Sequence, residues 1–339
     1  MKLYKYRCDI KRDIKMLVEN KLFAPNKKKL NDPTEMSFND SEFLDFLDKH
    51  KEHSLPVKKQ FDDIKDFTKK KCGIFSLSKC VRNELLWAYY AKGHKGFCIE
   101  YNSDIIMESY NYELETKNSL LKYKPLVQLI EVNYQDSYPV FTGDLLTDDQ
   151  TPAIKCLFGT KSESWKRENE VRLIFNKYGL TEIDYRAVTG IYFGMKFYDK
   201  NKKADVMQKL QGRGIKYYQM KFEDKSYKMD FDEIEDKYAS APKYISNNLP
   251  YDNISWSGLP SEYPDYKEYK KFAIRALEFV RKEPCINKIE SCYISLPPNP
   301  MIAITTAVND DFNTYPIKIY RFDIDITTNE IIPRRFQRS

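Results

Sequence analysis

The stretch Trp165-Lys166-Arg167-Glu168-Asn169-Glu170-Val171-Arg172, followed by Leu173-Ile174-Phe175, places two glutamates at the start of an apolar run. Such a run predicts a buried strand. Residues two apart in a strand point to the same face, so we expect Glu168 and Glu170 side by side, about 6–7 Å apart at the backbone. Adjacent carboxylates repel, which raises the pKa of one and suits a site that removes a proton or meets a developing positive charge. A solvated strand end with compensating arginines is the structural interpretation.

Many short apolar segments surround this stretch, with a few helical patterns between them. Strands are predicted over residues 3–7, 73–77, 97–101, 126–134, 171–176, 188–194 and 214–222. Helices are predicted over residues 9–20, 40–71, 81–91, 151–160 and 203–212. The elements do not alternate strictly, which favours an α+β fold with a mostly antiparallel sheet. The sequence contains neither G-x-G-x-x-G nor a Walker lysine motif.

The pattern changes in the last third of the chain. Residues 231–263 have few periodic segments and are interpreted as a linker. A clear amphipathic helix over 266–282 is followed by strands over 290–296, 301–308 and 316–326. We therefore divide the chain into a core over 1–230, a linker over 231–263 and a small α+β appendage over 264–339.

Composition limits the class of protein. The chain has 339 residues, of which 42% are hydrophobic and 31% charged, as is typical of globular proteins. Its net charge of +6 is smaller than that of a dedicated nucleic-acid binder. Seven scattered cysteines without a C-x-x-C pair indicate reduced thiols, and three histidines do not predict a zinc site. The start of the chain lacks an apolar leader, and no stretch approaches about 20 apolar residues, so we expect a cytoplasmic protein without membrane contact.

Several motifs in a fixed order resemble a widespread bacterial family known as a domain of unknown function. The resemblance covers residues 1–230 and rests on a set of short segments: Leu3-Tyr4-Lys5-Tyr6-Arg7, Asn31-Asp32-Pro33, Ser76-Leu77-Ser78, Trp87-Ala88-Tyr89-Tyr90-Ala91, Lys95-Gly96-Phe97-Cys98-Ile99-Glu100-Tyr101 and the W-x-x-E-x-E-x-R segment that begins at Trp165.

The chain also resembles, more distantly, ADP-ribosyltransferases of the Arg–Ser–Glu type. These enzymes carry an arginine on the first core strand, a Ser-x-Ser on a later strand and a Glu/Gln-x-Glu before another strand. By this resemblance Arg7 holds the phosphate or ribose of NAD, and Ser76 and Ser78 shape the nicotinamide pocket. Glu170 binds the nicotinamide ribose and stabilises the oxocarbenium ion, while Glu168 orients or activates the acceptor. Leu77 stands where the family usually has threonine.

The resemblance implies a split β-sheet core and an enzyme that uses NAD as substrate and requires no metal. It transfers ADP-ribose to a macromolecular acceptor, protein or nucleic acid, or hydrolyses NAD. A toxin or phage-defence effector with an antitoxin or regulatory partner is the implied setting. We expect Arg7, Ser76 and Glu170 on neighbouring strands around one pocket, with Glu168 at its rim. The appendage serves either acceptor recognition or stabilisation of the core.

Two alternatives remain open from the sequence. The first is a non-enzymatic module that binds nucleic acid or protein, in which Glu168 and Glu170 belong to an ion-pair network. The second is a metal nuclease with ligands Asp32, Glu100, Glu168 and Glu170. The decisive observation is whether Arg7, Ser76 and Glu170 line one cleft.

Overall fold

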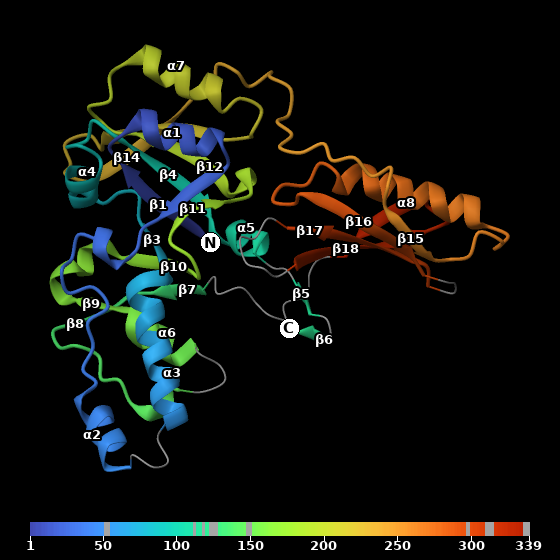
Figure 1. The fold of residues 1–339 in the computed structure, drawn as a ribbon. Helices are drawn as coiled ribbons and strands as arrows, with labels where there is room; N and C mark the ends of the chain where they lie inside the picture. Colours follow the sequence, from blue (N-terminus) through green and yellow to red (C-terminus); the bar gives the residue numbers. More distant parts are fainter. Residues whose placement is uncertain are drawn as a thin grey trace. The chain divides into compact units, whose positions relative to one another are not determined.

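The computed structural model describes residues 1–50, 55–110, 113–116, 119–121, 128–146, 151–295, 299–308 and 315–334 (Figure 1). The chain forms two compact units. Unit one comprises Met1–Met107 and Leu126–Lys243, and unit two comprises Glu108–Pro125 and Tyr244–Ser339.

An eight-stranded sheet forms the centre of unit one, in the order β14-β13-β12-β4-β1-β3-β10-β7. Neighbouring strands are antiparallel except for the parallel pair β12 and β13. The eight strands are β1 (Lys2–Arg7), β3 (Gly73–Ser78), β4 (Phe97–Asn102), β7 (Gln128–Glu131), β10 (Glu170–Phe175), β12 (Val188–Phe193), β13 (Lys216–Phe222) and β14 (Met229–Ile234). Two small ribbons complete the unit, β2 (Lys21–Ala24) with β11 (Gly179–Glu182) and β8 (Asn133–Gln135) with β9 (Thr160–Ser162).

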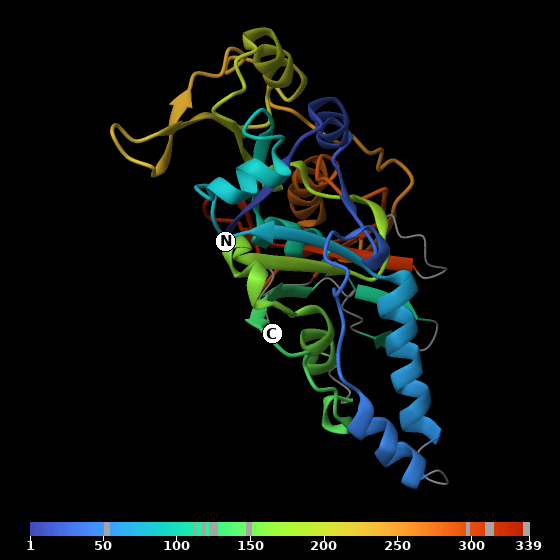
Figure 2. The same cartoon turned by 90° about the vertical axis from the view of Figure 1, so that its left-hand side faces the viewer.

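Short helices connect these strands. They are α1 (Ile10–Val18), α2 (Ser41–Lys49), α3 (Leu55–Asp66), α4 (Glu84–Tyr90), α5 (Ser103–Ser109), α6 (Thr151–Phe158) and α7 (Lys200–Lys209), with single turns η1 (Lys27–Lys29), η2 (Phe67–Lys71), η3 (Gly143–Leu145), η4 (Glu163–Glu168) and η5 (Tyr185–Ala187). Asp9, Asn83 and Asp199 cap the starts of α1, α4 and α7 by accepting backbone N–H bonds. Figures 1 and 2 show α3 extending away from β3 toward α2.

The sheet of unit one opens between β1 and β3. On one side β1 pairs with β4 over six residues. On its other side it pairs with β3 at a single position, Tyr4 with Ser78. Strand β3 in turn pairs with β10 over its whole length. The half of the sheet that ends at β1 and the half that begins at β3 are therefore joined at one residue pair and diverge beyond it. The candidate site lies in the opening between these two strands.

Unit two is a second sheet with a helix on one face. Its strand order is β15-β16-β17-β18-β5-β6, and β19 also pairs with β18. The elements are β5 (Glu113–Thr116), β6 (Ser119–Leu121), β15 (Ser255–Gly258), α8 (Tyr266–Val280), β16 (Lys288–Ile294), β17 (Met301–Ala307), β18 (Tyr315–Asp325) and β19 (Glu330–Pro333). Helix α8 buries apolar side chains at helical spacing against this sheet: Tyr269, Phe272, Ala273, Ala276, Leu277 and Val280.

These findings confirm the α+β class and the mostly antiparallel pairing. The boundaries of the units differ from those drawn on the sequence. Unit one continues to Lys243, and the segment interpreted as a linker contains most of β14 and all of β15. The β5–β6 hairpin belongs to unit two although it lies within residues 1–230. These boundaries depend on which distant segments pair as strands, and the local composition of the sequence does not indicate that pairing. Among the described helices, none combines the length and the apolar character that crossing a membrane requires.

Candidate functional site

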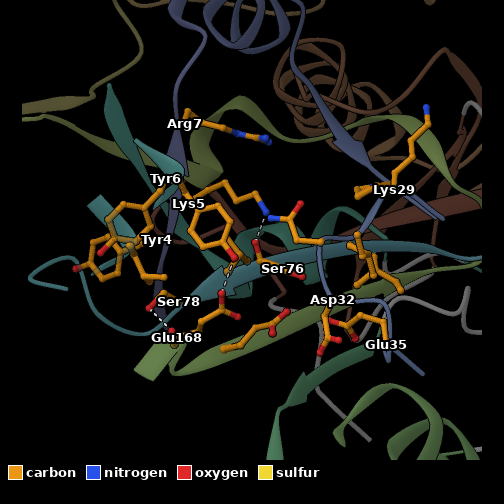
Figure 3. Close-up of a pocket in the computed structure, with 18 of the residues that line it drawn as sticks. Tyr4, Lys5, Tyr6, Arg7, Lys29, Asp32, Glu35, Ser76, Ser78 and Glu168 are labelled. Carbon is orange, nitrogen blue, oxygen red and sulfur yellow. Dashed lines mark hydrogen bonds between the residues drawn. The ribbon is translucent and has the colours of Figure 1, made fainter. Parts of the chain in front are cut away.

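A pocket of about 300 Å³ lies where β1 and β3 diverge (Figure 3). All five residues predicted from the sequence line it: Arg7, Ser76, Ser78, Glu168 and Glu170. They come from three neighbouring strands, β1, β3 and β10, and from the end of η4. The lower part of the pocket in Figure 3 holds Glu168, Asp32 and Glu35, and the upper part holds Arg7 and Lys29.

The acidic wall is built around a buried arginine. Arg172 is 0% exposed and its guanidinium donates to Glu170 through Nε (2.9 Å to Oε1) and to Glu35 through a terminal nitrogen (2.8 Å). A further hydrogen bond of 2.9 Å reaches the carbonyl oxygen of Phe158. A buried cation is tolerated only when its charge and its donors are satisfied, and this arrangement meets both conditions.

A lysine that the sequence did not single out joins the three carboxylates. The ammonium of Lys161, on β9, lies 2.6 Å from Glu168 Oε2, 3.1 Å from Glu170 Oε2 and 3.4 Å from Glu35 Oε1. The hydroxyl of Tyr90 donates to the other oxygen of Glu168 at 2.7 Å. Glu168 and Glu170 are thus held in fixed orientations by neighbours from three different elements.

The two glutamates do not lie on one extended strand, which corrects the first expectation. Glu168 ends the 3-10 turn η4, and Asn169 adopts a left-handed conformation with φ of 45° before β10 begins at Glu170. Asparagine tolerates this conformation better than most residues. The carboxylates nevertheless converge, because both bind the Lys161 ammonium.

The sequence predicts a raised pKa for one of the two adjacent glutamates, and Glu170 is not that residue. Burial by itself would raise the pKa of this carboxyl, but Arg172 and Lys161 outweigh burial, and with a hydrogen bond from Ser76 they lower the pKa to about 2. Opposite charges within contact distance favour the ionised form more than a neighbouring carboxylate disfavours it. Glu170 therefore stays ionised at neutral pH.

Glu35 is the third carboxylate of the wall, and the sequence patterns did not predict it. It follows the Asn-Asp-Pro motif, whose Asp32 accepts hydrogen bonds from the backbone N–H (2.8 Å) and the hydroxyl (2.7 Å) of Thr34. This Asx turn directs Glu35 toward Arg172. Burial raises the pKa of Glu35 although Arg172 and Lys161 oppose the rise. Nothing local to the motif indicates that the residue after it reaches the pocket.

The opposite wall carries cations with fewer partners. The guanidinium of Arg7 lies 5.8 Å from the ring centroid of Phe75 and 3.9 Å from Asp13, and its buried Nε has no hydrogen-bond partner among the described residues. Arg12 and Lys29 also line the pocket. Arg12 is bonded to Asp13 at 3.1 Å, so one carboxylate serves both arginines.

Arg7 and Glu170 project from opposite faces of the sheet. The register pairs Tyr4 with Ser78 and Ser78 with Glu170, which places these three side chains on one face. Arg7, three residues from Tyr4, points to the other face by strand alternation. Both residues line the pocket, but their projection from opposite faces contradicts the expectation that they meet on one side of the sheet.

Lys5 occupies this opening. Its ammonium donates to the carbonyl oxygen of Ser76 at 2.5 Å and lies 5.0 Å from the Phe75 ring centroid (Figure 3). Burial, reinforced by the nearby charge of Arg7, lowers the pKa of Lys5 to about 7. The side chain bridges the two halves of the sheet where the strands no longer pair.

The two predicted serines have different surroundings. Ser76 meets Glu170 through its hydroxyl and Lys5 through its carbonyl oxygen. Ser78 is buried, donates its hydroxyl to the carbonyl of Glu168 at 2.8 Å and accepts from the backbone N–H of Cys80 at 3.2 Å. The Ser78 hydroxyl thus fixes the chain around Glu168.

The four carboxylates considered for a metal nuclease do not converge. Glu100 lies outside the pocket lining and is buried elsewhere, bonded to Thr189 (2.7 Å) and Tyr192 (2.8 Å). Where Glu168 and Glu170 meet, the Lys161 ammonium fills the position of a bridging cation. In the described part of the chain, no group of three or more His, Cys, Asp or Glu side chains is arranged to hold a metal ion.

A known family model matches a segment of the chain that contains part of this site. The family model described as "Protein of unknown function (DUF2971)" matches residues 86–173. The match runs from α4 to β10 and includes both pocket glutamates, Glu168 and Glu170. The predicted resemblance to a family of unknown function is confirmed over these residues. No curated protein and no solved structure matches the chain.

Proposed function

We propose that the pocket binds NAD and that the protein is an ADP-ribosyltransferase-like enzyme, which transfers ADP-ribose to a macromolecular acceptor or to water. One observation carries the proposal: a single pocket has cations along β1 and η1 and an ionised buried carboxylate at the start of β10. NAD has the complementary division, with an anionic pyrophosphate and a positively charged nicotinamide ring on a ribose that gains positive charge as the bond to nicotinamide breaks.

The pyrophosphate would lie on the cationic wall. Arg7 offers an Nε that has no hydrogen-bond partner among the described residues, and Lys5 and Lys29 add ammonium groups to the lining. Guanidinium and ammonium groups form strong charge-assisted hydrogen bonds with phosphate oxygens. Because Arg7 and Glu170 project from opposite faces, a ligand that touches both has to run through the opening between β1 and β3.

The nicotinamide ribose would lie against Glu170. Cleavage breaks the bond between the ribose C1′ and the nicotinamide nitrogen, the electron pair leaves with neutral nicotinamide, and positive charge develops on the ribose, as in glycoside hydrolysis. A carboxylate fixed before the reaction stabilises that charge without reorganising. An acceptor lone pair then attacks C1′, and Glu168 takes the acceptor proton.

A nicotinamide-release assay tests this proposal. Glu170→Gln should lower the rate by at least about 10²-fold if Glu170 stabilises the oxocarbenium ion. Glu168→Gln should impair transfer to acceptor more than hydrolysis of NAD. Glu131→Gln on β7 is the matched control, because Glu131 is an exposed glutamate paired with Lys79. Since Glu170 also binds Arg172, circular dichroism must establish that each variant is folded.

Two results would contradict the enzyme. One is wild-type protein that releases no nicotinamide when protein, nucleic acid and water are each offered as acceptor. The other is equal release by folded Glu170→Gln and wild type.

A second candidate is a non-enzymatic module that binds nucleic acid or protein. The observation that favours it is the internal balance of the acidic wall, where Lys161 and Arg172 already neutralise most of the charge of Glu35, Glu168 and Glu170. A carboxylate offset in this way stabilises a developing cation less than a free one. In this case Glu170→Gln alters stability and leaves partner binding unchanged.

A further inference from the structure

A row of cations covers the outer face of α8 in unit two. With about 100° per residue, Lys267, Lys270, Lys271 and Arg275 lie on the side of the helix away from its buried apolar side chains, and Arg281 and Lys282 follow the end of the helix. Two glutamates, Glu268 and Glu278, are the acidic residues of the helix. The positive charge of the outer side is therefore concentrated in the first three turns, at Lys267, Lys270, Lys271 and Arg275.

The cations near the C-terminal end of α8 have hydrogen-bond or ion-pair partners, whereas the lysines of its first turns form no ion pair with any described residue. Glu278 serves Arg281 (3.0 Å) and Lys282 (3.9 Å). Arg275 donates to the carbonyl oxygen of Asn329 at 2.9 Å. In the described part of the structure Lys267, Lys270 and Lys271 form no ion pair.

Helix α7 of unit one shows the ordinary solvated arrangement for comparison. It is also lysine-rich, yet Lys202 pairs with Asp199 at 3.2 Å and Lys209 pairs with Asp205 at 2.7 Å. The other two lysines of α7, Lys200 and Lys203, form no ion pair in the described part of the structure, and Lys203 donates to Gln219. The first two turns of α8 carry three lysines and one glutamate, Glu268, and these lysines form no ion pair among the described residues.

The ammonium of one of these lysines, Lys270, lies over two aromatic rings. The Lys270 ammonium is 5.3 Å from the ring centroid of Trp256 and 5.5 Å from that of Tyr266. Trp256 lies on β15, the edge strand of the sheet, and is 37% exposed. A large indole on an open edge strand next to such cations has the chemistry of a platform on which bases stack.

We propose that unit two binds single-stranded nucleic acid through the outer face of α8 and the ring of Trp256. The lysines neutralise phosphates and release counterions, which makes binding salt-dependent. Trp256 and Tyr266 stack on unpaired bases, which favours single strands over duplex because bases in a duplex are already stacked. The binding itself is independent of the pocket. Only the further step, in which the bound strand is the acceptor of ADP-ribose, rests on the proposed function.

The test measures binding of the full chain to fluorescein-labelled oligothymidylate of about 16 nucleotides, by anisotropy and without NAD. Salt is varied between about 50 and 200 mM. The test variant is Lys267→Ala with Lys271→Ala, and the matched control is Lys202→Ala with Lys209→Ala, which removes the same charge from α7. Trp256→Ala and Trp256→Phe separate stacking from charge.

We expect the α8 variant to reduce the slope of log affinity against log salt by about 1.4, that is about 0.7 for each phosphate that is no longer neutralised. The α7 control should keep the wild-type slope. Trp256→Ala should weaken binding about tenfold or more, and Trp256→Phe should restore most of the affinity because phenylalanine also stacks.

Three outcomes would overturn the proposal: absence of salt-sensitive binding by the wild type, equal weakening by the α8 and α7 variants, and tighter binding of a duplex of the same length. Because no NAD is present, a failure of this binding leaves the proposal for the pocket untouched. A failure of the nicotinamide assay likewise leaves the binding result untouched.

Discussion

On the acidic wall of the pocket both oxygens of Glu170 are bonded to Arg172 and Lys161, whereas on the cationic wall the buried Nε of Arg7 has no hydrogen-bond partner among the described residues. Strand β10 is buried along its whole length, and its charges are satisfied within the fold. Strand β1 pairs fully with β4 but leaves its other edge at the opening.

The charged groups of the acidic wall therefore stabilise the fold, whereas those of the cationic wall can still bind a ligand. The acidic wall is fixed before anything binds, because breaking its ion pairs exposes a buried charge without compensation. The cationic wall has a donor, Arg7 Nε, without a hydrogen-bond partner among the described residues, and under the proposed function this donor would contact the anionic part of the ligand. Substitutions on the two walls should therefore change different measured quantities.

The largest effect is expected at Arg172. Arg172→Met leaves Glu170 and Glu35 buried without their main counter-charge, and we expect a loss of about 3–5 kcal/mol in the free energy of unfolding, measured with urea. Arg82→Met is the control, because Arg82 pairs with Asp230 at the surface and its loss should cost less than about 1 kcal/mol. Equal losses of unfolding free energy in the two variants would mean that the ion pairs of Arg172 do not stabilise the acidic wall.

The next effect concerns acid stability. The pKa of Glu170 is about 2 in the folded protein and about 4.5 when unperturbed, so its ionised form contributes stability above about pH 4.5 that is lost as the pH falls through about 2. A shift of this size corresponds to about 3 kcal/mol. Glu170→Gln should remove this part of the acid transition, and Glu131→Gln should not. An unchanged dependence of urea stability on pH in Glu170→Gln would contradict the ion-pair assignment.

A smaller effect is expected on the cationic wall. Lys5, with a pKa of about 7, carries its charge below neutral pH and loses it above. If it contacts the pyrophosphate, NAD affinity should fall about tenfold as the pH rises from about 6 to 9, since one charge-assisted hydrogen bond is lost. Calorimetric titration of Lys5→Met should show a flat profile over this range. A wild-type profile that is equally flat would remove Lys5 from the binding site.

The smallest effect distinguishes the two serines. Ser78→Ala leaves the backbone N–H of Cys80 without its acceptor and should cost about 1 kcal/mol of stability, with the rate of nicotinamide release unchanged. Ser76→Ala should change that rate or the NAD affinity instead, because the Ser76 hydroxyl meets Glu170. If Ser78→Ala instead changed the rate and Ser76→Ala only the stability, the roles assigned to the two serines would be wrong.

The strands that carry the site were easier to predict from the sequence than the contacts within it. Segments 3–7, 73–77 and 171–176 are strands β1, β3 and β10, because their apolar patterns are local. Lys161 was missed because its segment has no motif, and Glu35 was missed because the Asn-Asp-Pro motif before it does not indicate that a nearby residue reaches the pocket. The conformation at Asn169 was missed because a single left-handed residue interrupts a run whose pattern otherwise predicts an extended chain.

Nothing in the sequence pattern indicates that the β5–β6 hairpin belongs to unit two. Its partner β18 lies far along the chain, and pairing at such distance leaves no local pattern. One practical result is that a truncation near residue 240 does not isolate unit one. Clean removal of unit two has to take out Glu108–Pro125 as well as the residues from Tyr244 onward.

The insertion of β5 also sets an order of events during synthesis. Roughly 200 residues separate β5 from β18, so at about 5–20 residues per second the strand emerges about 10–40 s before the segment that pairs with it. During that interval its backbone groups are open to other strands. Unit two therefore cannot complete its sheet until the β18 segment has been made, and until then the β5–β6 hairpin has an unpaired edge.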